Sequence, residues 1–238
     1  MALIFGKNST RTSAATSPIT TASFTIETNE KVLVLMLKAV GGTNRGGGSP
    51  TFGGQTMTQA NSTQKDASSP EASAELWYLL DPPTGANTAS IPNTGSLTIY
   101  YTLATGTASS TASGKVALDG ANGGNATSTN PTPGAVTVTV AQALGFAIIA
   151  GGHVNFSTGT PIASAIATTD DGAHGGGEQY QNVTTGPGSF TLSWTHGTSD
   201  DWGAVAAFFR EIEPPKMENY KGGFDSGSGI ISVGEKIR

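Results

Sequence analysis

The stretch Ser96–Leu103 reads SLTIYYTL, and its pattern shows most clearly how this chain folds. Apolar side chains alternate with other side chains along it, Leu97, Ile99, Tyr101 and Leu103 on one side and Thr98, Tyr100 and Thr102 on the other. A period of two is typical of a β-strand with one face in a core and one in water. We therefore expect the face that carries Leu97 to be buried and the face that carries Tyr100 to be wet.

Working outward, the rest of the chain repeats this pattern in two forms. Alternation recurs in Ser23–Glu27, Val136–Val140 and Phe190–Thr195. Continuous apolar runs, typical of inner strands covered on both faces, occur at Val32–Leu37, Leu76–Leu80, Leu144–Ala150 and Ala204–Phe209. Three further strands are expected at Gly53–Ala60, Gly114–Asp119 and Ile162–Thr168. Gly and Pro separate the runs, and no segment has a helical period. The pattern predicts an all-β protein, a jelly-roll-like antiparallel β-sandwich of about ten strands with extended N- and C-terminal arms.

The sequence also contains a weak internal repeat. Ala22–Gly42 and Gly134–Gly152 both read as an alternating strand, a short turn, a buried run and a Gly-Gly pair. Phe24 and Val136 occupy matching positions 112 residues apart. The repeat fits a jelly roll, in which two Greek keys interleave, and it also fits the chance presence of two similar hairpins in a large β protein.

The composition excludes several classes of function. Of 238 residues, 33 are Gly, 23 Ser and 34 Thr, and only 12% are charged, about half the usual share of roughly 25%. The absence of Cys excludes disulfides and thiolate chemistry. A net charge of -5 argues against nucleic acid as a partner. No apolar run approaches the length of a membrane span, so we expect no membrane partner either.

The sequence predicts three regions. Residues 1–20 are expected to form an N-terminal arm, residues 21–213 the sandwich domain and residues 214–238 an extended C-terminal arm that begins at Pro214-Pro215. Apolar residues spaced through such arms gain most when another surface buries them. The expected partner contacts are Leu3, Ile4, Phe5, Tyr220, Phe224, Ile230, Ile231, Val233 and Ile237.

Residues that could carry chemistry are few and scattered. His153, His174 and His196 belong to no ligand motif, and the acidic pairs Asp170-Asp171 and Asp200-Asp201 lack the spacing of a calcium loop. Glu75 is the best single carboxylate for a glycosidase, but it has no evident partner. Trp77 and Trp194 are expected in the core rather than in a sugar-stacking platform. We therefore predict no catalytic residues, no metal, no cofactor and no enzymatic activity.

Four segments, in order, carry a resemblance to a known family. They are Phe52–Thr58 (FGGQTMT), Glu75–Gly85 (ELWYLLDPPTG), Ser193–Thr195 and Trp202–Phe209. Together they resemble a jelly-roll, concanavalin-like sandwich module of phage virion structural proteins, over roughly residues 20 to 213. The motifs of that module are structural, and the family carries no catalytic residues.

The resemblance implies a virion location and a role in assembly. The first expectation is a capsid decoration or cement protein that contacts further copies of itself and a virion protein such as the major capsid protein. Alternatives are a tail-associated or fibre-base protein, or a carbohydrate-binding or adhesion module, which would need exposed aromatic side chains or a Ca²⁺ site.

Overall fold

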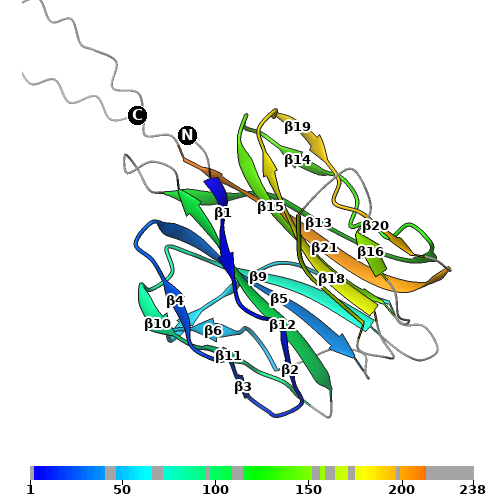
Figure 1. Ribbon diagram of the computed structural model, residues 1–238, viewed down its shortest axis with the longest axis horizontal. Coiled ribbons are helices and arrows are strands. Elements are labelled where there is room, and N and C mark those ends of the chain that lie inside the picture. Colours follow the sequence, from blue (N-terminus) through cyan, green and yellow to red (C-terminus); the bar gives the residue numbers. More distant parts are fainter. Residues whose placement is uncertain are drawn as a thin grey trace, which may run out of the picture.

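The structure is a computed structural model that describes residues 3–40, 47–65, 72–94, 97–108, 115–151, 156–158, 164–170, 175–196 and 199–212. Every regular element in these residues is a β-strand, and all strand pairs are antiparallel. The predicted all-β antiparallel sandwich is thus confirmed (Figure 1).

Two large sheets form the centre of the molecule. The first has six strands in the order β1-β12-β5-β9-β8, with β2 also paired to β12. Its strands are β1 Leu3–Asn8, β2 Thr12–Ala14, β5 Glu30–Val40, β8 Thr58–Lys65, β9 Ala72–Leu80 and β12 Thr98–Ala108. The second sheet has five strands in the order β13-β21-β15-β18-β17. Its strands are β13 Val116–Ser128, β15 Ala143–Gly151, β17 Ser164–Asp170, β18 Gly175–Val183 and β21 Asp200–Glu211.

Short strands form an outer layer on each large sheet. Over the first sheet these are β3 Ile19–Thr20, β4 Phe24–Ile26, β6 Thr51–Phe52, β7 Gln55–Thr56, β10 Gly85–Asn87 and β11 Ala89–Ile91. Over the second they are β14 Val136–Val138, β16 Phe156–Thr158, β19 Gly188–Phe190 and β20 Trp194–His196. The molecule is therefore a stack of four β layers, with the two large sheets face to face in the middle (Figure 1).

The two large sheets have the same strand order and the same path of the chain. Strands β1, β12, β5, β9 and β8 of the first sheet match β13, β21, β15, β18 and β17 of the second. The outer pair β10-β4 likewise matches β19-β14, with Phe24 and Val136 as the first residues of β4 and β14. The internal repeat in the sequence thus corresponds to two parts of the chain that have the same order of strands. We call residues 3–108 the first half and residues 116–211 the second half.

This arrangement differs from a single jelly roll with two interleaved Greek keys. Within each half the chain passes alternately between the large sheet and its outer layer, so each half builds its own two-layer sandwich. The halves then join through their large sheets. The physical reason is that the central runs of β5, β15 and β21 are apolar on both faces, so each large sheet needs a cover on each side.

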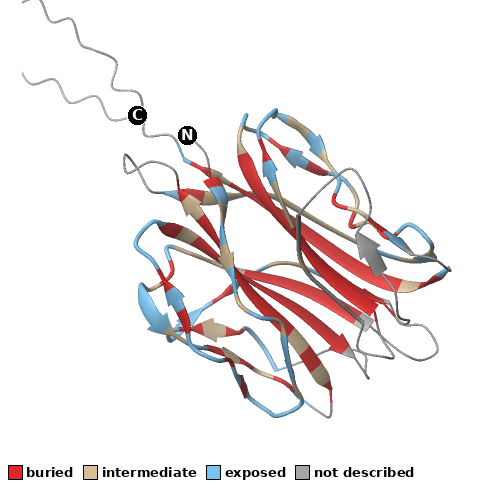
Figure 2. Ribbon diagram, in the orientation of Figure 1, coloured by how far each residue is buried: buried red, intermediate tan, exposed pale blue. Residues whose placement is uncertain are grey.

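Three apolar cores lie between the four layers. The central core draws on both large sheets, with Val34 and Met36 from β5 facing Phe146 and Ile148 from β15. Leu33 and Leu35 point the other way, into the core under the first outer layer. Val32–Leu37 was predicted to be covered on both faces, and all of its side chains are at most 1% exposed. Figure 2 shows the buried residues running along the large sheets while the outer strands carry most of the exposed ones.

The duplication also corrects the expectation for Ser96–Leu103. Ile99, Tyr101 and Leu103 are buried under the outer layer as predicted. The opposite face is not wet, because it faces the second half. Thr102 is fully buried there, and Tyr100 is only partly exposed.

Candidate functional site

The N-terminal residues expected to contact partners belong instead to the sheet of their own chain. β1 pairs with β12 from Leu3↔Ala108 onward, and Leu3 is buried in the central core. The prediction that residues 1–20 form an arm is therefore corrected for the described part, which contains β1, β2 and β3. The apolar residues that begin with Leu3 form a strand because they pair with the edge of β12 and because the second half covers their inner face.

Phe5 fixes β1 to the second half. Its ring stacks on Tyr180 of β18 with a centroid distance of 3.8 Å and an interplanar angle of 12°. Its backbone N–H donates a hydrogen bond of 3.0 Å to Asn182 Oδ1. The partner of Phe5 is thus its own chain, whereas Ile4 points outward and is 44% exposed.

The end of the molecule where β1 begins and β21 ends combines three features (Figure 1). Ile4 and Ile212 are the large hydrophobic side chains that the described residues leave exposed, at 44% and 38%. The Ile212 N–H donates to the Lys115 carbonyl at 2.9 Å, so the strand is held up to this point. A cavity of about 640 Å³ opens beside it and is lined by Val140, Ala141, Gln142, Thr184, Arg210, Glu211 and Ile212. We call this region the terminal end.

The C-terminal contact residues expected from the sequence lie outside the described residues. These are Tyr220, Phe224, Ile230, Ile231, Val233 and Ile237. The structure describes the chain as far as Ile212, at the edge of the cavity of the terminal end.

Arg210, which lines this cavity, has a structural partner. Arg210 Nε lies 3.1 Å from Asp119 Oδ1. Asp119 also accepts hydrogen bonds from the Thr139 backbone N–H at 2.7 Å and from its hydroxyl at 2.5 Å. These contacts tie the end of β14 to β13.

The acidic residues considered for chemistry are separated in the fold. Glu75 is buried, and its Oε2 accepts a 2.6 Å hydrogen bond from Trp77 Nε1. Asp200 is buried, and Asp201 accepts a short hydrogen bond from the Thr127 hydroxyl. His153, His174 and Asp171 lie outside the described residues, as do the side chains of Asp170 and His196. Within the described part of the chain, no three His, Asp or Glu side chains gather as metal ligands would.

The tryptophans are core residues. Trp77 is 7%, Trp194 1% and Trp202 4% exposed, which confirms the prediction for Trp77 and Trp194. Trp202 Nε1 donates to Ser128 Oγ at 3.0 Å. None of the three can present its face to a sugar.

One polar cluster was not predicted from the sequence. Arg11, Lys38 and Glu178 come together between the large sheets, with side-chain exposures of 5% for Arg11 and 0% for Glu178, and with Lys38 fully buried. Arg11 Nη1 lies 3.4 Å from Glu178 Oε2. Burial raises the pKa of Glu178 to about 7, although the nearby charges of Arg11 and Lys38 act in the opposite direction. The sequence carried no signal for this cluster, because its members are distant and only the packing of the halves joins them.

None of the described segments forms a helix with the length and hydropathy that a membrane crossing requires.

Comparisons with known proteins find no relative of this chain. The chain matches no protein-family model, no curated protein and no solved structure at a significant level.

Proposed function

We propose that this chain is a non-enzymatic structural protein of a viral particle, and that it acts as a capsid decoration or cement protein. In this role it would bind further copies of itself and a shell protein such as the major capsid protein. It would stabilise the particle by burying apolar surface between subunits, which is a linkage effect and requires no chemistry.

The terminal end is the observation that carries the proposal. It combines the exposed side chains of Ile4 and Ile212 with a large cavity, and the sequence continues from it for residues 213–238. That continuation contains Met217, Tyr220, Phe224, Ile230, Ile231, Val233 and Ile237. Each such side chain contributes about 1.5–3 kcal/mol when it is fully buried, before the cost of ordering the chain. Several together are enough to hold a subunit on a neighbour.

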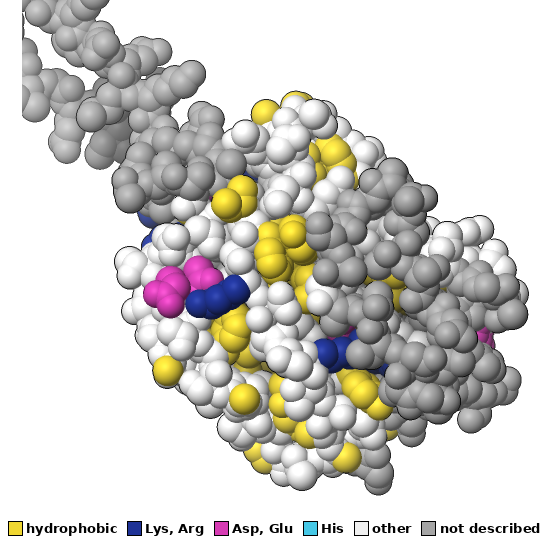
Figure 3. Space-filling model, in the orientation of Figure 1, with side chains coloured by type: hydrophobic (Ala, Val, Ile, Leu, Met, Phe, Trp, Pro, Cys, Tyr) yellow, Lys and Arg dark blue, Asp and Glu magenta, His cyan; other side chains and the backbone are white. Residues whose placement is uncertain are grey.

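The surface chemistry and the sequence resemblance support the same role. Ser and Thr replace most of the usual charged residues, and Figure 3 shows only small groups of Lys, Arg, Asp and Glu on the face in view. Threonine favours strands while it presents a hydroxyl group to solvent. The four segments that resemble the sandwich module of phage virion proteins point to the same class.

The test is mass spectrometry of density-gradient-purified particles from cultures that express this gene. We expect the protein in the particle fraction, in a fixed and high ratio to the major capsid protein. A low copy number together with release in the tail fraction would favour the tail-associated or fibre-base alternative. Absence from the particles after a mild salt wash would overturn the proposal.

The carbohydrate-binding or adhesion alternative receives no support from the described residues. It required exposed aromatic rings or a Ca²⁺ site at Asp170-Asp171 or Asp200-Asp201. The three tryptophans and Asp200 are buried, and Asp171 and the side chain of Asp170 lie outside the described residues. Phe24 and Tyr101 line a cavity of about 240 Å³, but both rings belong to the buried core under the outer layer.

A further inference from the structure

Asn122 and Gly123 form the single Asn-Gly pair in the sequence. The pair lies in the middle of β13, the end strand of the second large sheet, and both residues are half-buried. Among the described strands, β13 has a hydrogen-bonded neighbour on one edge only, which is β21. The pair is therefore accessible to water, and its backbone is held from one side.

Two hydrogen bonds hold the side chain of Asn122 in one orientation. Its Oδ1 accepts from the backbone N–H of Gly123 at 2.8 Å, and its Nδ2 donates to the backbone carbonyl of Ala135 at 3.0 Å. One end of a side-chain amide accepts and the other donates, so the two bonds fix which end is the nitrogen. The Gly123 nitrogen thus lies against the side-chain carbonyl, while Nδ2 is directed to Ala135.

This arrangement favours ring closure between the backbone amide and the side-chain amide. Oδ1 is bonded to Cγ, so the 2.8 Å contact leaves the Gly123 nitrogen next to the carbon that it would attack. Reactions gain most when the reacting atoms are already held in close and oriented contact. Gly123 also has no Cβ atom, so no side chain shields its nitrogen.

We propose that Asn122-Gly123 is a site of self-modification, at which the folded chain converts its own Asn122 into aspartate or isoaspartate. The Gly123 nitrogen gives its proton to hydroxide and attacks Cγ, and the new N–Cγ bond closes a cyclic imide. The Cγ–Nδ2 bond breaks, and Nδ2 leaves as ammonia after it takes a proton from water. Water then adds to either imide carbonyl, and the ring opens to a carboxylate. This inference does not depend on the virion proposal.

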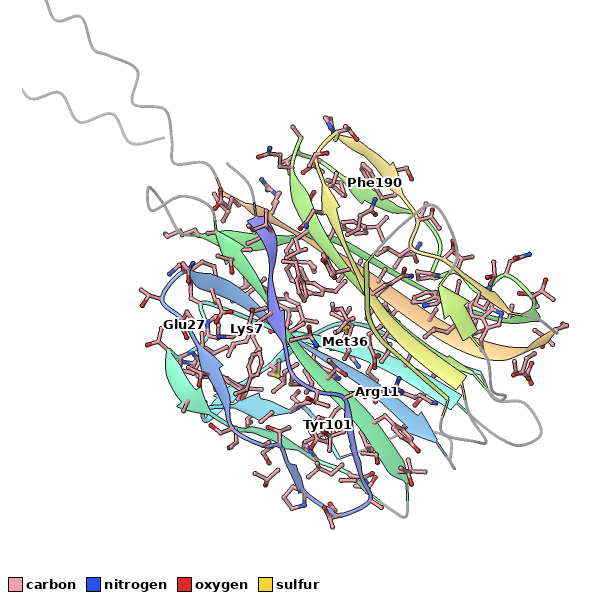
Figure 4. All side chains as sticks on the ribbon, in the orientation of Figure 1. Lys7, Arg11, Glu27, Met36, Tyr101 and Phe190 are labelled. Carbon is pink, nitrogen blue, oxygen red and sulfur yellow. The ribbon has the colours of Figure 1, made fainter. Side chains whose placement is uncertain are left out.

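The modification releases the connection between β13 and β14. A carboxylate has no proton to donate to the Ala135 carbonyl, so the bond from Nδ2 is lost and two acceptors face each other. The chain packs closely here, because a Cβ atom at Gly134 would lie 2.7 Å from Nδ2. The connection leads into Val136 of β14, which pairs with Phe190 of β19 (Figure 4). A new negative charge at position 122 thus loosens the start of this outer strand pair.

The experiment incubates the purified full chain at pH 6 and at pH 8 and maps the products by peptide mass spectrometry. We expect the peptide that contains Asn122 to gain the mass difference between OH and NH2, with an equal amount of ammonia released. The rate should be at least several-fold higher at pH 8, because the attacking nitrogen must lose a proton. A parallel sample in urea reports on the unfolded chain. Modification in urea but not in the native protein would overturn the proposal.

Three variants make the result decisive. Asn122→Gln should stop the reaction, because closure onto the longer side chain requires a larger ring. Asn125→Gln is the matched control and should leave the modification intact, since Asn125 lies in the same strand, is more exposed and precedes Ala126. Asn122→Asp carries the charge of the product and should increase hydrogen exchange over residues 134–138.

Two outcomes would contradict the proposal in different ways. Equal modification of Asn122 and Asn125 in the native wild type would show that the contacts of Asn122 contribute nothing, and it would overturn the site. Unchanged hydrogen exchange in Asn122→Asp would overturn the release of the connection between β13 and β14.

Discussion

At the scale of single residues, Glu178 is expected to make the stability of the fold depend on pH. Its carboxyl group is fully buried between the halves, and burial raises its pKa from the usual 4.5 to about 7. A raised carboxyl pKa means that the folded state holds its proton more tightly than the unfolded state does. The stabilising contribution is therefore present below about pH 4.5 and is lost as the pH rises to 7 and above.

The prediction compares wild type with Glu178→Gln, which stays neutral at every pH. Between pH 5 and pH 8 we expect the free energy of unfolding of the wild type to fall relative to the variant, by up to roughly 3 kcal/mol. Urea unfolding at a series of pH values measures the difference. Parallel pH curves for the two proteins would show that Glu178 does not titrate in this range.

A second residue-scale prediction concerns Gly145 in β15. A Cβ atom there would overlap the ring of the fully buried Phe208 on the neighbouring strand. Gly145→Ala should therefore destabilise the fold by about 1–3 kcal/mol in chemical denaturation. Gly188→Ala is the matched control, because its Cβ would meet Phe190 at an ordinary 3.6 Å, and it should be neutral or slightly stabilising. Equal effects of the two changes would mean that β15 and β21 are not packed as closely as described.

At the scale of elements, β1 is the strand whose position the sequence least foretold. Phe5 stacks on Tyr180, and Lys7 Nζ lies 3.2 Å from the buried Glu30. Glu30 also accepts a 2.6 Å hydrogen bond from the Thr105 hydroxyl. These contacts join β1 to both halves of its own chain.

A double-mutant cycle tests this position of β1. Phe5→Leu and Tyr180→Leu should each lower the free energy of unfolding of the isolated protein. Their coupling energy should be about 0.5–1.5 kcal/mol, the range for stacked aromatic pairs. Urea denaturation of the two single variants and the double variant gives this value. Additive effects with no coupling would contradict the contact between Phe5 and Tyr180 and would favour the predicted N-terminal arm.

At the scale of the whole molecule, the interface between the halves is an apolar core that joins two sandwiches of the same strand order. The central core draws on both large sheets, and the segment between the halves, residues 109–114, reads SSTASG. A protease site inserted in this segment should allow cleavage without separation. We expect the two fragments to elute together in gel filtration under native conditions and to separate only in denaturant. Separation in native buffer would mean that the central core is too weak to join them.

The C-terminal continuation should matter for assembly rather than for folding. A chain that ends at Glu213 keeps all described strands, so its unfolding temperature should stay nearly unchanged. Its self-association, measured by sedimentation velocity, should weaken because the apolar residues from Met217 to Ile237 are removed. Unfolding of the truncated chain would show that this segment packs on its own domain, and unchanged association would remove it from the subunit interface.

The sequence by itself determined the class of fold and most of the inner strands. Strand periodicity is a local property, so Val32–Leu37 and Leu144–Ala150 identified β5 and β15 without knowledge of any partner. Local patterning also indicated that Trp77 and Trp194 are buried, and the 112-residue repeat marked β4 with β5 and β14 with β15.

Only the tertiary structure decided which strands share a sheet and what covers each face. The face of β12 that carries Tyr100 and Thr102 has a polar pattern, yet it lies against the second half. Arg11 and Glu178 are 167 residues apart and meet only because the large sheets pack face to face. Such contacts depend on the free energy of burying two whole surfaces together, which no window of the sequence contains.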